Sequence, residues 1–444
     1  MATLSDFLLF FGVIALWIAA IYLLDRKGLL SRHNLIPVGP FLMVKTKRGR
    51  DFIDRSARFT RAWRVFGDLS IVLVGLTMVG ITALLIWEAA LVRNIPADRA
   101  PSPELLLGVP GLNPIIPVGY GVFALAIAVA LHEFMHGILS RVAKVKVESL
   151  GILLCILPIG AFVEPSEPEL KALPRRERAR IYSVGAGINL LLALLFGVLF
   201  STMMLYGVEP VQPGIGIVGF TSPDAPALNR SWPTPLEVGS VIVALNGTST
   251  PSLVEFQAAR ARTNPGDNVS VVTWKAGVLV THWVVLGDDG RGTPILGIRT
   301  VETTTAFYHP FTDSDRFGGA PGALLLFISL PLTGYIPLQN PTTDFYRLSG
   351  PWSAVPEPVF YLIANAMYWL FWLNLMLGAT NALPAVPLDG GFVFRDGVEA
   401  LLARFRRGLP VDKRDRVVKS VSYAFALMIL ALILWQIIGP RLRF

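Results

Sequence analysis

Six long apolar runs restrict the fold of this 444-residue chain more than any other feature of its sequence. A helix needs about 20 mostly apolar residues to cross a bilayer. The runs occupy residues 7–24, 69–92, 117–139, 182–206, 359–383 and 421–438. Only 16% of the residues are charged, whereas a soluble domain carries roughly 25%. We therefore expect a polytopic α-helical membrane protein with about six transmembrane helices.

The first run could instead be a signal peptide, but its basic residues follow it and no clear small-residue cleavage site is present. A membrane anchor is therefore favoured. Two shorter apolar stretches, 150–163 and 320–335, are interrupted by Gly or Pro, and we expect them to be interfacial or re-entrant. The single cysteine, Cys155, excludes an internal disulfide framework.

Basic residues gather in three connections between the apolar runs, at 26–64, 141–180 and 395–419. The formal charge of +8 could suggest nucleic acid, but this distribution fits the positive-inside rule of membrane proteins better. We therefore expect the lipid bilayer, and no nucleic acid, as a partner. The rule predicts that the three connections lie in the cytoplasm. Alternation of six spans then predicts that the amino terminus and the long insert, 208–357, lie outside it.

Three ionisable residues, His132, Glu133 and His136, lie inside the third apolar run. Residues four apart share one face of a helix, so both imidazoles point to one spot with Glu133 beside them. In the H-E-x-x-H pattern, two histidines ligate zinc and the glutamate is the general base toward water that the metal activates. Such a pattern can arise by chance, but ionisable residues inside a span are rare and usually functional. The sequence therefore predicts a zinc site.

Two histidines leave this site incomplete, because catalytic zinc usually has three protein ligands. Asp389 follows the fifth apolar run, at the end where a third ligand is needed. Pro384 and Pro387 break the helix before it, so the backbone can turn Asp389 toward the histidines. The alternative is an acidic residue that begins a loop of two glycines. The depth of Asp389 in the membrane and its place on the cytoplasmic side match those of the histidines. They favour Asp389 as the third ligand of one Zn2+ per chain.

Two distant segments, HEFMHG at 132–137 and NALPAVPLDGG at 381–391, resemble the site-2 protease family of intramembrane zinc metalloproteases, which are M50-like peptidases. The second segment matches the family's N-x-x-P-x-x-x-L-D-G motif. GAFVEP at 160–165 and SVGAGINLL at 183–191 also look like family segments, with Asn189 at the position of a helix asparagine. The usual Gly-Pro before that asparagine is Gly185-Ala186 here. The resemblance implies that Asp389 supplies the third zinc ligand.

The same resemblance implies a metalloendopeptidase that hydrolyses peptide bonds of membrane-anchored substrate proteins, in regulated intramembrane proteolysis. Tethered transcription regulators and anti-sigma factors are the substrates that the family suggests. Asn189 and Asn381 are candidates for oxyanion stabilisation or substrate positioning, although interhelical hydrogen bonding is the alternative for both. Residues 148–163 could form a hairpin that pairs with an extended substrate, or a simple re-entrant scaffold.

The insert is expected to contain a small α/β domain. Strands are predicted at 241–245, 267–274 and 277–286, a helix at 251–261, and tight turns at 246–247 and 275–277. The segments 220–228, 237–259 and 264–274 resemble a PDZ domain, which implies that a peptide adds as a strand to a sheet edge. GIVGF at 216–220 is a candidate for the loop beside that groove. The alternative is a soluble cap that limits access by size.

The predicted domain organisation has five parts. Residues 1–116 form a membrane region with two transmembrane helices and a basic cytoplasmic loop, and 117–207 form the first half of the catalytic core. The PDZ-like domain occupies 208–303, an interfacial or re-entrant linker 304–357, and the second half of the core 358–444. This predicts a multi-pass cell-membrane protease with its active site near the cytoplasmic side and the PDZ-like domain extracytoplasmic. The alternative is a non-catalytic adaptor that binds peptides through the PDZ-like domain, but an adaptor has no need of Glu133.

Overall fold

The computed structural model describes residues 4–32, 35–39, 41–47, 49–96, 100–106, 108–155, 157–406 and 410–442. The chain divides into two compact units. The core unit comprises Met1–Leu195 and Leu370–Phe444, and the inserted unit comprises Phe196–Trp369. All the candidate catalytic and metal-binding residues belong to the core unit.

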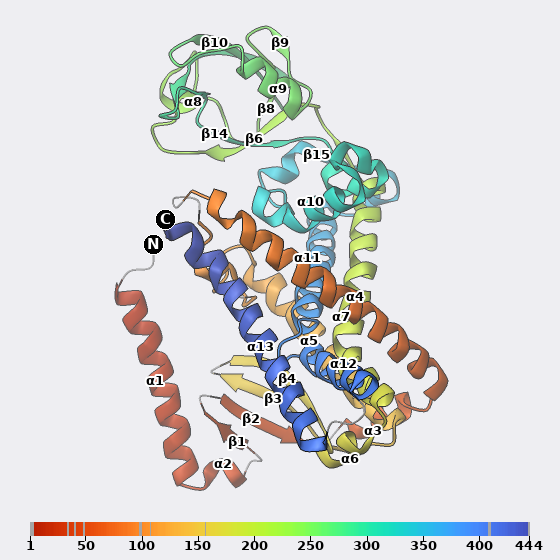
Figure 1. The fold of residues 1–444 in the computed structure, drawn as a ribbon. Helices are drawn as coiled ribbons and strands as arrows, with labels where there is room; N and C mark the ends of the chain where they lie inside the picture. Colours follow the sequence, from red (N-terminus) through yellow and green to blue (C-terminus); the bar gives the residue numbers. More distant parts are fainter. Residues whose placement is uncertain are drawn as a thin grey trace. The chain divides into compact units, whose positions relative to one another are not determined.

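Five helices among the described residues are long and apolar enough to cross a membrane. They are α4 (Thr60–Leu91), α5 (Val118–Val142), α7 (Arg175–Gly207), α11 (Glu357–Asn381) and α13 (Val411–Ile438) (Figure 1). They correspond to the second to sixth predicted runs, so the polytopic helical fold is confirmed. The first run lies within helix α1 (Leu4–Arg26). Many side chains of this helix are not among those that the structure describes.

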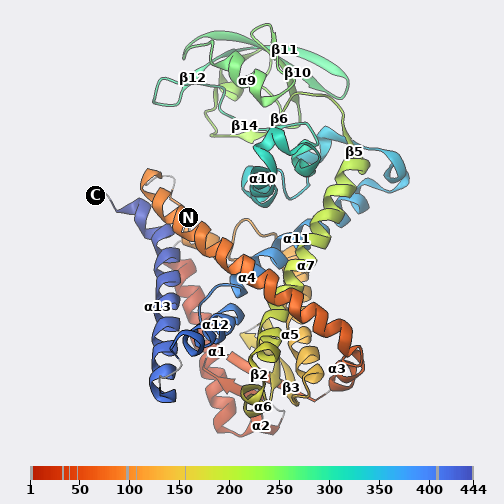
Figure 2. The same ribbon diagram turned by 45° about the vertical axis from the view of Figure 1, so that its right-hand side comes forward.

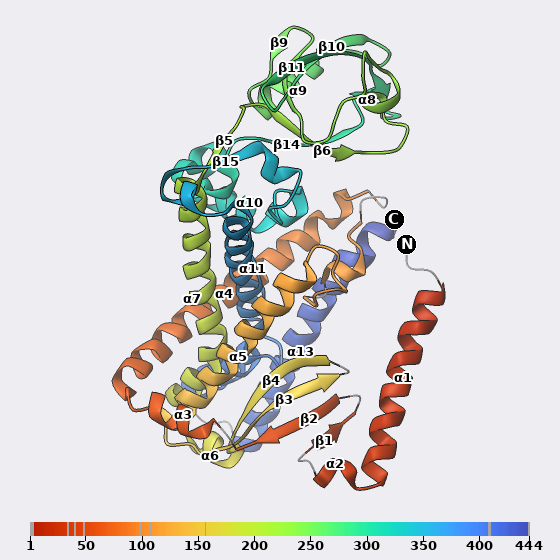
Figure 3. The ribbon, with the colours of Figure 1, turned by 180° about the vertical axis from the view of Figure 1, so that it is seen from behind.

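A four-stranded antiparallel sheet belongs to the core unit (Figure 3). Its order is β1 (Leu35–Val38), β2 (Phe41–Thr46), β3 (Val147–Cys155) and β4 (Leu157–Pro165). The last two strands form the hairpin predicted at 148–163, with Gly151 opposite Phe162. A Cβ on Gly151 would lie 2.2 Å from the Val44 carbonyl oxygen, so only glycine permits this close pairing of β2 and β3. Strand β4 is at an edge of the sheet.

An apolar cluster fixes α5 against its neighbours in the core unit. Buried Met135 and Leu139 of α5 pack with Ile181 and Val184 of α7, and with Ile53 of the short helix α3 (Arg50–Ser56). Between helices that cross a bilayer, such contacts stabilise the packing through van der Waals attraction rather than through removal from water. The packing holds α7 beside the turn of α5 that carries the two histidines.

The chain turns sharply between α11 and α12 (Asp389–Phe405). Helix α11 ends at Asn381, just before the prolines that were predicted to break it. A Cβ on Gly390 would lie 2.3 Å from the Ala382 carbonyl oxygen, and one on Gly391 would lie 2.5 Å from the Ala385 carbonyl carbon. The two glycines therefore let the first turn of α12 pack directly on the backbone of this connection.

The inserted unit contains an antiparallel sheet (Figure 2). Its order is β14 (Ile298–Glu302), β6 (Ile215–Phe220), β8 (Val241–Leu245), β10 (Asn268–Lys275), β11 (Val278–Val285) and β7 (Ser231–Trp232), with β9 (Thr248–Ser249) beside β8. Helix α9 (Leu253–Arg260) packs Phe256 and Ala259 into the core of the sheet. The predicted strands, helix and turns of this region are confirmed, including positive φ at Asn246 and Gly247.

One expectation for the insert is wrong. GIVGF at 216–220 is not a loop, because it lies within β6, which pairs with β14 along its length and with β8 at Ile215 and Gly216. Strand β14 stands at one end of the sheet order, so one of its edges has no strand partner among the described residues.

The segment after the sheet forms the rest of the inserted unit. It contains the 3-10 helix η5 (Pro310–Phe317) and helix α10 (Gly319–Thr333), which are bent by 113° at a short break. This bent pair has the composition of a broken span or a re-entrant loop, so the interfacial or re-entrant interpretation of 320–335 stays a prediction. Further on, β15 (Tyr346–Leu348) pairs with β5 (Val208–Pro210).

Candidate functional site

His132 and His136 lie one turn apart on α5, and α12 brings Asp389 to the same point. The Nε2 atoms of the two histidines are 3.2 Å apart. Oδ2 of Asp389 is 3.1 Å from Nε2 of His132 and 3.2 Å from Nε2 of His136. The backbone therefore turns Asp389 toward the histidines after the helix break, as predicted. The three candidate ligands converge at one point.

The triangle formed by the two Nε2 atoms and Oδ2 of Asp389 has the size and chemistry of a metal site. Four ligands placed tetrahedrally at about 2.0–2.1 Å from an ion are about 3.3–3.4 Å apart, close to the observed separations. The Oδ2 atom of Asp389 is buried and accepts no hydrogen bond from the described residues. Two imidazoles and one carboxylate form a donor set that catalytic zinc takes, with a fourth position left open. The residues present therefore fit a divalent metal ion.

The outer nitrogens of both imidazoles face α7. Nδ1 of His136 lies 2.7 Å from the carbonyl oxygen of Ile181. Nδ1 of His132 lies 3.4 Å from the side-chain amide nitrogen of Asn189, a residue with no solvent exposure. Partners of this kind fix the tautomer and the orientation of metal-binding histidines.

Glu133 lies next to this triangle and is held from one side. Its Oε2 atom accepts a 3.0 Å hydrogen bond from the backbone N–H of Val163 on β4. No partner within the described chain is found for Oε1 of Glu133, so this oxygen remains available for a proton. Asn381 differs from Asn189, because its amide nitrogen donates to the Leu377 carbonyl of its own helix at 3.1 Å.

Three contributors to the site were missed by the sequence reasoning. Two are backbone groups, the Ile181 carbonyl and the Val163 N–H, which no residue pattern could reveal. The third is Gly185, where a Cβ would lie 2.4 Å from Nε2 of His136 and 2.6 Å from Nε2 of His132. Its small size was visible in the GAG segment, but the reason for it required the structure.

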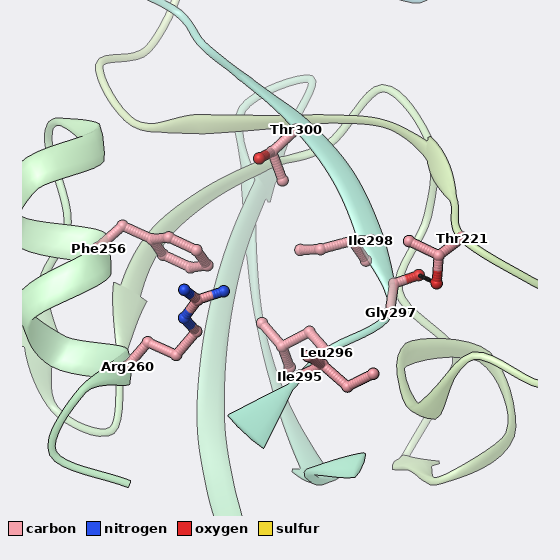
Figure 4. Close-up of a pocket in the computed structure, with 8 residues that line it drawn as sticks. All are labelled: Thr221, Phe256, Arg260, Ile295, Leu296, Gly297, Ile298 and Thr300. Atoms are coloured by element: carbon pink, nitrogen blue, oxygen red, sulfur yellow. Dashed lines mark hydrogen bonds between the residues drawn. The ribbon is translucent and has the colours of Figure 1, made fainter. Parts of the chain in front are cut away.

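The inserted unit contains a separate cavity of about 130 Å³ (Figure 4). Side chains of Phe256 and Arg260 extend from α9 toward Ile295 and Ile298. The complete lining is Thr221, Phe256, Arg260, Ile295, Leu296, Gly297, Ile298 and Thr300. An apolar cavity of about 150 Å³ holds one benzene molecule, so this cavity has room for a single side chain of a ligand.

Unpaired polar groups surround that cavity. The carbonyls of Leu296 and Gly297 accept hydrogen bonds from the backbone N–H groups of Ala227 and Thr221, at 3.0 and 2.9 Å. Within the described chain, the N–H groups of Leu296 and Gly297 themselves find no acceptor, and the half-buried Arg260 guanidinium has neither an ion pair nor a hydrogen bond. Backbone N–H groups beside an arginine are suited to binding a carboxylate.

Comparison with known proteins shows the family of the chain. The family model described as peptidase family M50 matches residues 120–429, which include all the converging residues. The chain belongs to peptidase family M50. The resemblance drawn from the two distant motifs is therefore confirmed, and the protein is an integral membrane protein of a peptidase family.

Three relatives illustrate the range of this M50 similarity. An uncharacterized protein, MJ0971 of Methanocaldococcus jannaschii, is 25% identical over 90% of this chain and 88% of its own. The zinc metalloprotease RasP of Oceanobacillus iheyensis is 22% identical over 62% of each chain. The putative zinc metalloprotease CA_C1796 of Clostridium acetobutylicum is 24% identical over 70% of this chain and 94% of its own. The chain thus matches less than two thirds of the length of RasP.

Proposed function

We propose that this M50 protein is a zinc-dependent intramembrane metalloendopeptidase of the site-2 type, which cleaves membrane-anchored proteins within or near their spans. The observation that carries the proposal is the convergence of His132, His136 and Asp389 beside the carboxylate of Glu133. Two relatives with zinc metalloprotease in their names agree with zinc as the metal. An adaptor that only binds peptides has no use for such a carboxylate.

In this proposal Nε2 of His132, Nε2 of His136 and Oδ2 of Asp389 hold one Zn2+. When bound, zinc lowers the pKa of a coordinated water to about 7 and polarises the carbonyl that is attacked. His132 is buried and the other two residues are partly buried inside the core unit. The oxyanion role predicted for Asn381 stays a prediction.

Glu133 is the general base. Its Oε1 takes the proton that water gives up as the new C–O bond forms, and delivers it to the nitrogen of the departing amine as the C–N bond breaks. The hydrogen bond from Val163 to Oε2 keeps the carboxylate facing the site. Because Val163 is part of β4, the base and the sheet edge are positioned together.

The edge strand β4 is proposed to bind the substrate backbone. A helix hides its peptide bonds in internal hydrogen bonds, so a cleavable segment must become extended. Residue Val163 directs its N–H away from β3 toward Glu133, and alternate residues of a strand face the same edge. The edge that receives the substrate strand is therefore the one that faces the base.

The proposed orientation places the three basic connections in the cytoplasm. Ion pairs join them within the core unit, between Arg141 and Asp54 and between Arg175 and Glu399. Their positive charge then lies at one end of the unit, as the positive-inside rule requires. Helix α7 begins in this basic region and leads into the insert, so the insert is extracytoplasmic in this scheme.

The insert is proposed to be a PDZ-like domain that binds the free carboxyl end of an extended peptide. The unpaired edge of β14 supplies backbone hydrogen bonds, and the cavity takes one apolar side chain. The N–H groups of Leu296 and Gly297, together with Arg260, are suited to the terminal carboxylate. This specific set of unpaired groups favours peptide binding over a role as a passive size filter.

The test compares wild-type protein with Glu133→Gln and Asp389→Ala in detergent. Zinc content and cleavage of a model transmembrane substrate with helix-weakening residues are measured in the same preparations. We expect zinc in wild type and Glu133→Gln, cleavage in wild type alone, and loss of zinc from Asp389→Ala. Zinc without cleavage in wild type across several substrates would favour the adaptor, and wild type without zinc would refute the metal site.

A further inference from the structure

Helix α7 faces the two candidate zinc ligands at three points that are one turn apart. The carbonyl of Ile181 meets Nδ1 of His136 at 2.7 Å, and the side chain of Asn189 meets Nδ1 of His132 at 3.4 Å. Gly185 lies between them, against both Nε2 atoms. The spacing of four residues puts all three points on one face of α7. Helix α7 therefore contacts both histidines along one of its faces.

The proton on each imidazole can be assigned from this arrangement. A neutral histidine that gives the lone pair of Nε2 to a metal carries its proton on Nδ1. For His136, this Nδ1–H donates to the Ile181 carbonyl oxygen. His132 is 5% exposed, so its Nδ1–H also needs an acceptor, and the Asn189 side chain is its neighbour in the described structure.

The orientation of the Asn189 amide decides whether that need is met. With Nδ2 toward the ring, two donors face each other, while Oδ1 is buried without a partner. The oxygen and nitrogen of an amide occupy nearly the same positions, so the hydrogen-bond network determines which is which. Turning the amide by a half rotation places Oδ1 opposite Nδ1–H of His132. Nδ2 then takes the buried position that Oδ1 holds in the other orientation.

We propose that Asn189 is a positioning residue whose Oδ1 accepts the Nδ1–H of His132 and holds Nε2 toward the metal. This inference rests on the proposed zinc function. It differs from the oxyanion role considered for Asn189, because an oxyanion needs an N–H donor and His132 needs an oxygen acceptor. Substitution by aspartate separates the two roles, since a carboxylate keeps the acceptor and loses the donor.

The experiment measures zinc affinity, by competition with a chelator, for intact wild type, Asn189→Ala and Asn189→Asp in detergent. The absorption spectrum of the Co2+-substituted proteins reports the ligand geometry independently of activity. We expect a roughly 10–100-fold lower zinc affinity and an altered Co2+ spectrum in Asn189→Ala. We expect Asn189→Asp to keep the affinity and the spectrum, and to retain cleavage.

Asn374→Ala is the matched control, because Asn374 is also fully buried, with an unpartnered Oδ1, on α11. It should leave zinc affinity unchanged. Wild-type affinity in Asn189→Ala would overturn the proposal, as would equal loss of affinity in Asn189→Ala and Asn189→Asp. Wild-type affinity in both, with cleavage lost in both, would assign Asn189 to the oxyanion instead. Absence of zinc from wild type would refute the proposed function itself.

Discussion

The backbone N–H of Val163 donates a 3.0 Å hydrogen bond to Oε2 of Glu133. This bond joins the edge of a sheet to the proposed general base, and it shows which edge of β4 faces Glu133. Because backbone groups alternate along a strand, the N–H of Ala161 also points away from β3. It lies two residues, or about 7 Å, from Val163, so a substrate strand paired at Ala161 would pass close to Glu133.

Ala161→Pro tests this pairing, because proline removes the outward N–H without removing a bond to β3. We expect roughly tenfold lower kcat/KM, from the loss of one substrate hydrogen bond of about 1 kcal/mol and the added ring. Zinc content should be unchanged. The measurement is steady-state cleavage of a model transmembrane substrate, with metal analysis of the same samples.

Ala161→Val is the control for this strand, because it enlarges the side chain and keeps the N–H. Phe162→Pro is a contrasting variant, because the N–H of Phe162 points toward β3. Loss of this N–H should lower the melting temperature of the protein. Cleavage by Ala161→Pro at the wild-type rate would contradict substrate pairing at this edge.

Gly185→Ala should weaken the metal site without weakening the helix. The added Cβ would approach both Nε2 atoms to within 2.4–2.6 Å, so the imidazoles must move. Alanine favours a helix over glycine by about 1 kcal/mol, which excludes poorer helix formation as the cause. We expect at least about tenfold lower zinc affinity, measured by chelator competition.

Gly80→Ala serves as the control for Gly185→Ala. Gly80 lies in spanning helix α4, and a Cβ there meets nothing within 4 Å. It should bind zinc like wild type and melt at the same or a higher temperature. If Gly185→Ala also binds zinc like wild type, the close packing of α7 on the histidines is not required for metal binding.

Side-chain chemistry made the three converging residues predictable from the sequence, whereas their backbone partners carry no signal in it. His132 and His136 stand four residues apart in an apolar run, and Asp389 follows a proline-broken one. These signals need no tertiary information. The Ile181 carbonyl and the Val163 N–H carry no such signal, because every residue has these groups and only the packing of α5 against α7 and β4 selects them.

The strand order in the insert could not be predicted from the sequence, because it also depends on contacts between distant segments. The alternation in 267–274 and the Asn246-Gly247 turn predicted strands, because those patterns are local. Which strand lies at the edge depends on pairing between distant segments, such as Thr300 with Ile217. GIVGF was therefore expected to be a loop beside the groove, whereas the structure places it in β6, next to β14 at one end of the sheet order.

Arg260→Glu tests the carboxylate site of the insert. Loss of a charge-assisted hydrogen bond costs about 1.5–3 kcal/mol, and like-charge repulsion adds to it. We expect at least about tenfold weaker binding of peptides with a free carboxyl end to the intact protein. Fluorescence polarisation with a panel of labelled peptides measures this, and amidation of the peptide end should weaken wild-type binding similarly.

Arg262→Glu makes the same charge change at an exposed position outside the cavity. It should bind the peptides like wild type. A size filter, in contrast, predicts no peptide binding by any of the three proteins, together with faster cleavage of substrates that have small extracytoplasmic ends.

Glu399 ties α12, the helix that begins with Asp389, to two spanning helices. Its carboxylate pairs with Arg175 of α7 at 2.9 Å and with Arg414 of α13 at 3.9 Å. Burial alone would raise the pKa of Glu399 above its ordinary value of 4.5, but Arg175, Arg178 and Arg414 outweigh it and lower the pKa. The charged form is therefore the one that stabilises the fold.

Glu399→Gln should destabilise the protein by about 1 kcal/mol at pH 7, because the arginines lose a charged acceptor. Since the folded-state pKa is lowered, this contribution is complete above pH 4.5 and is lost as the pH falls through the folded-state value. The melting temperatures of wild type and Glu399→Gln in detergent should therefore differ at pH 7 and converge as the pH falls below 4.5. A difference that stays constant from pH 7 to pH 3 would mean that the charge of Glu399 contributes nothing to the packing of α12.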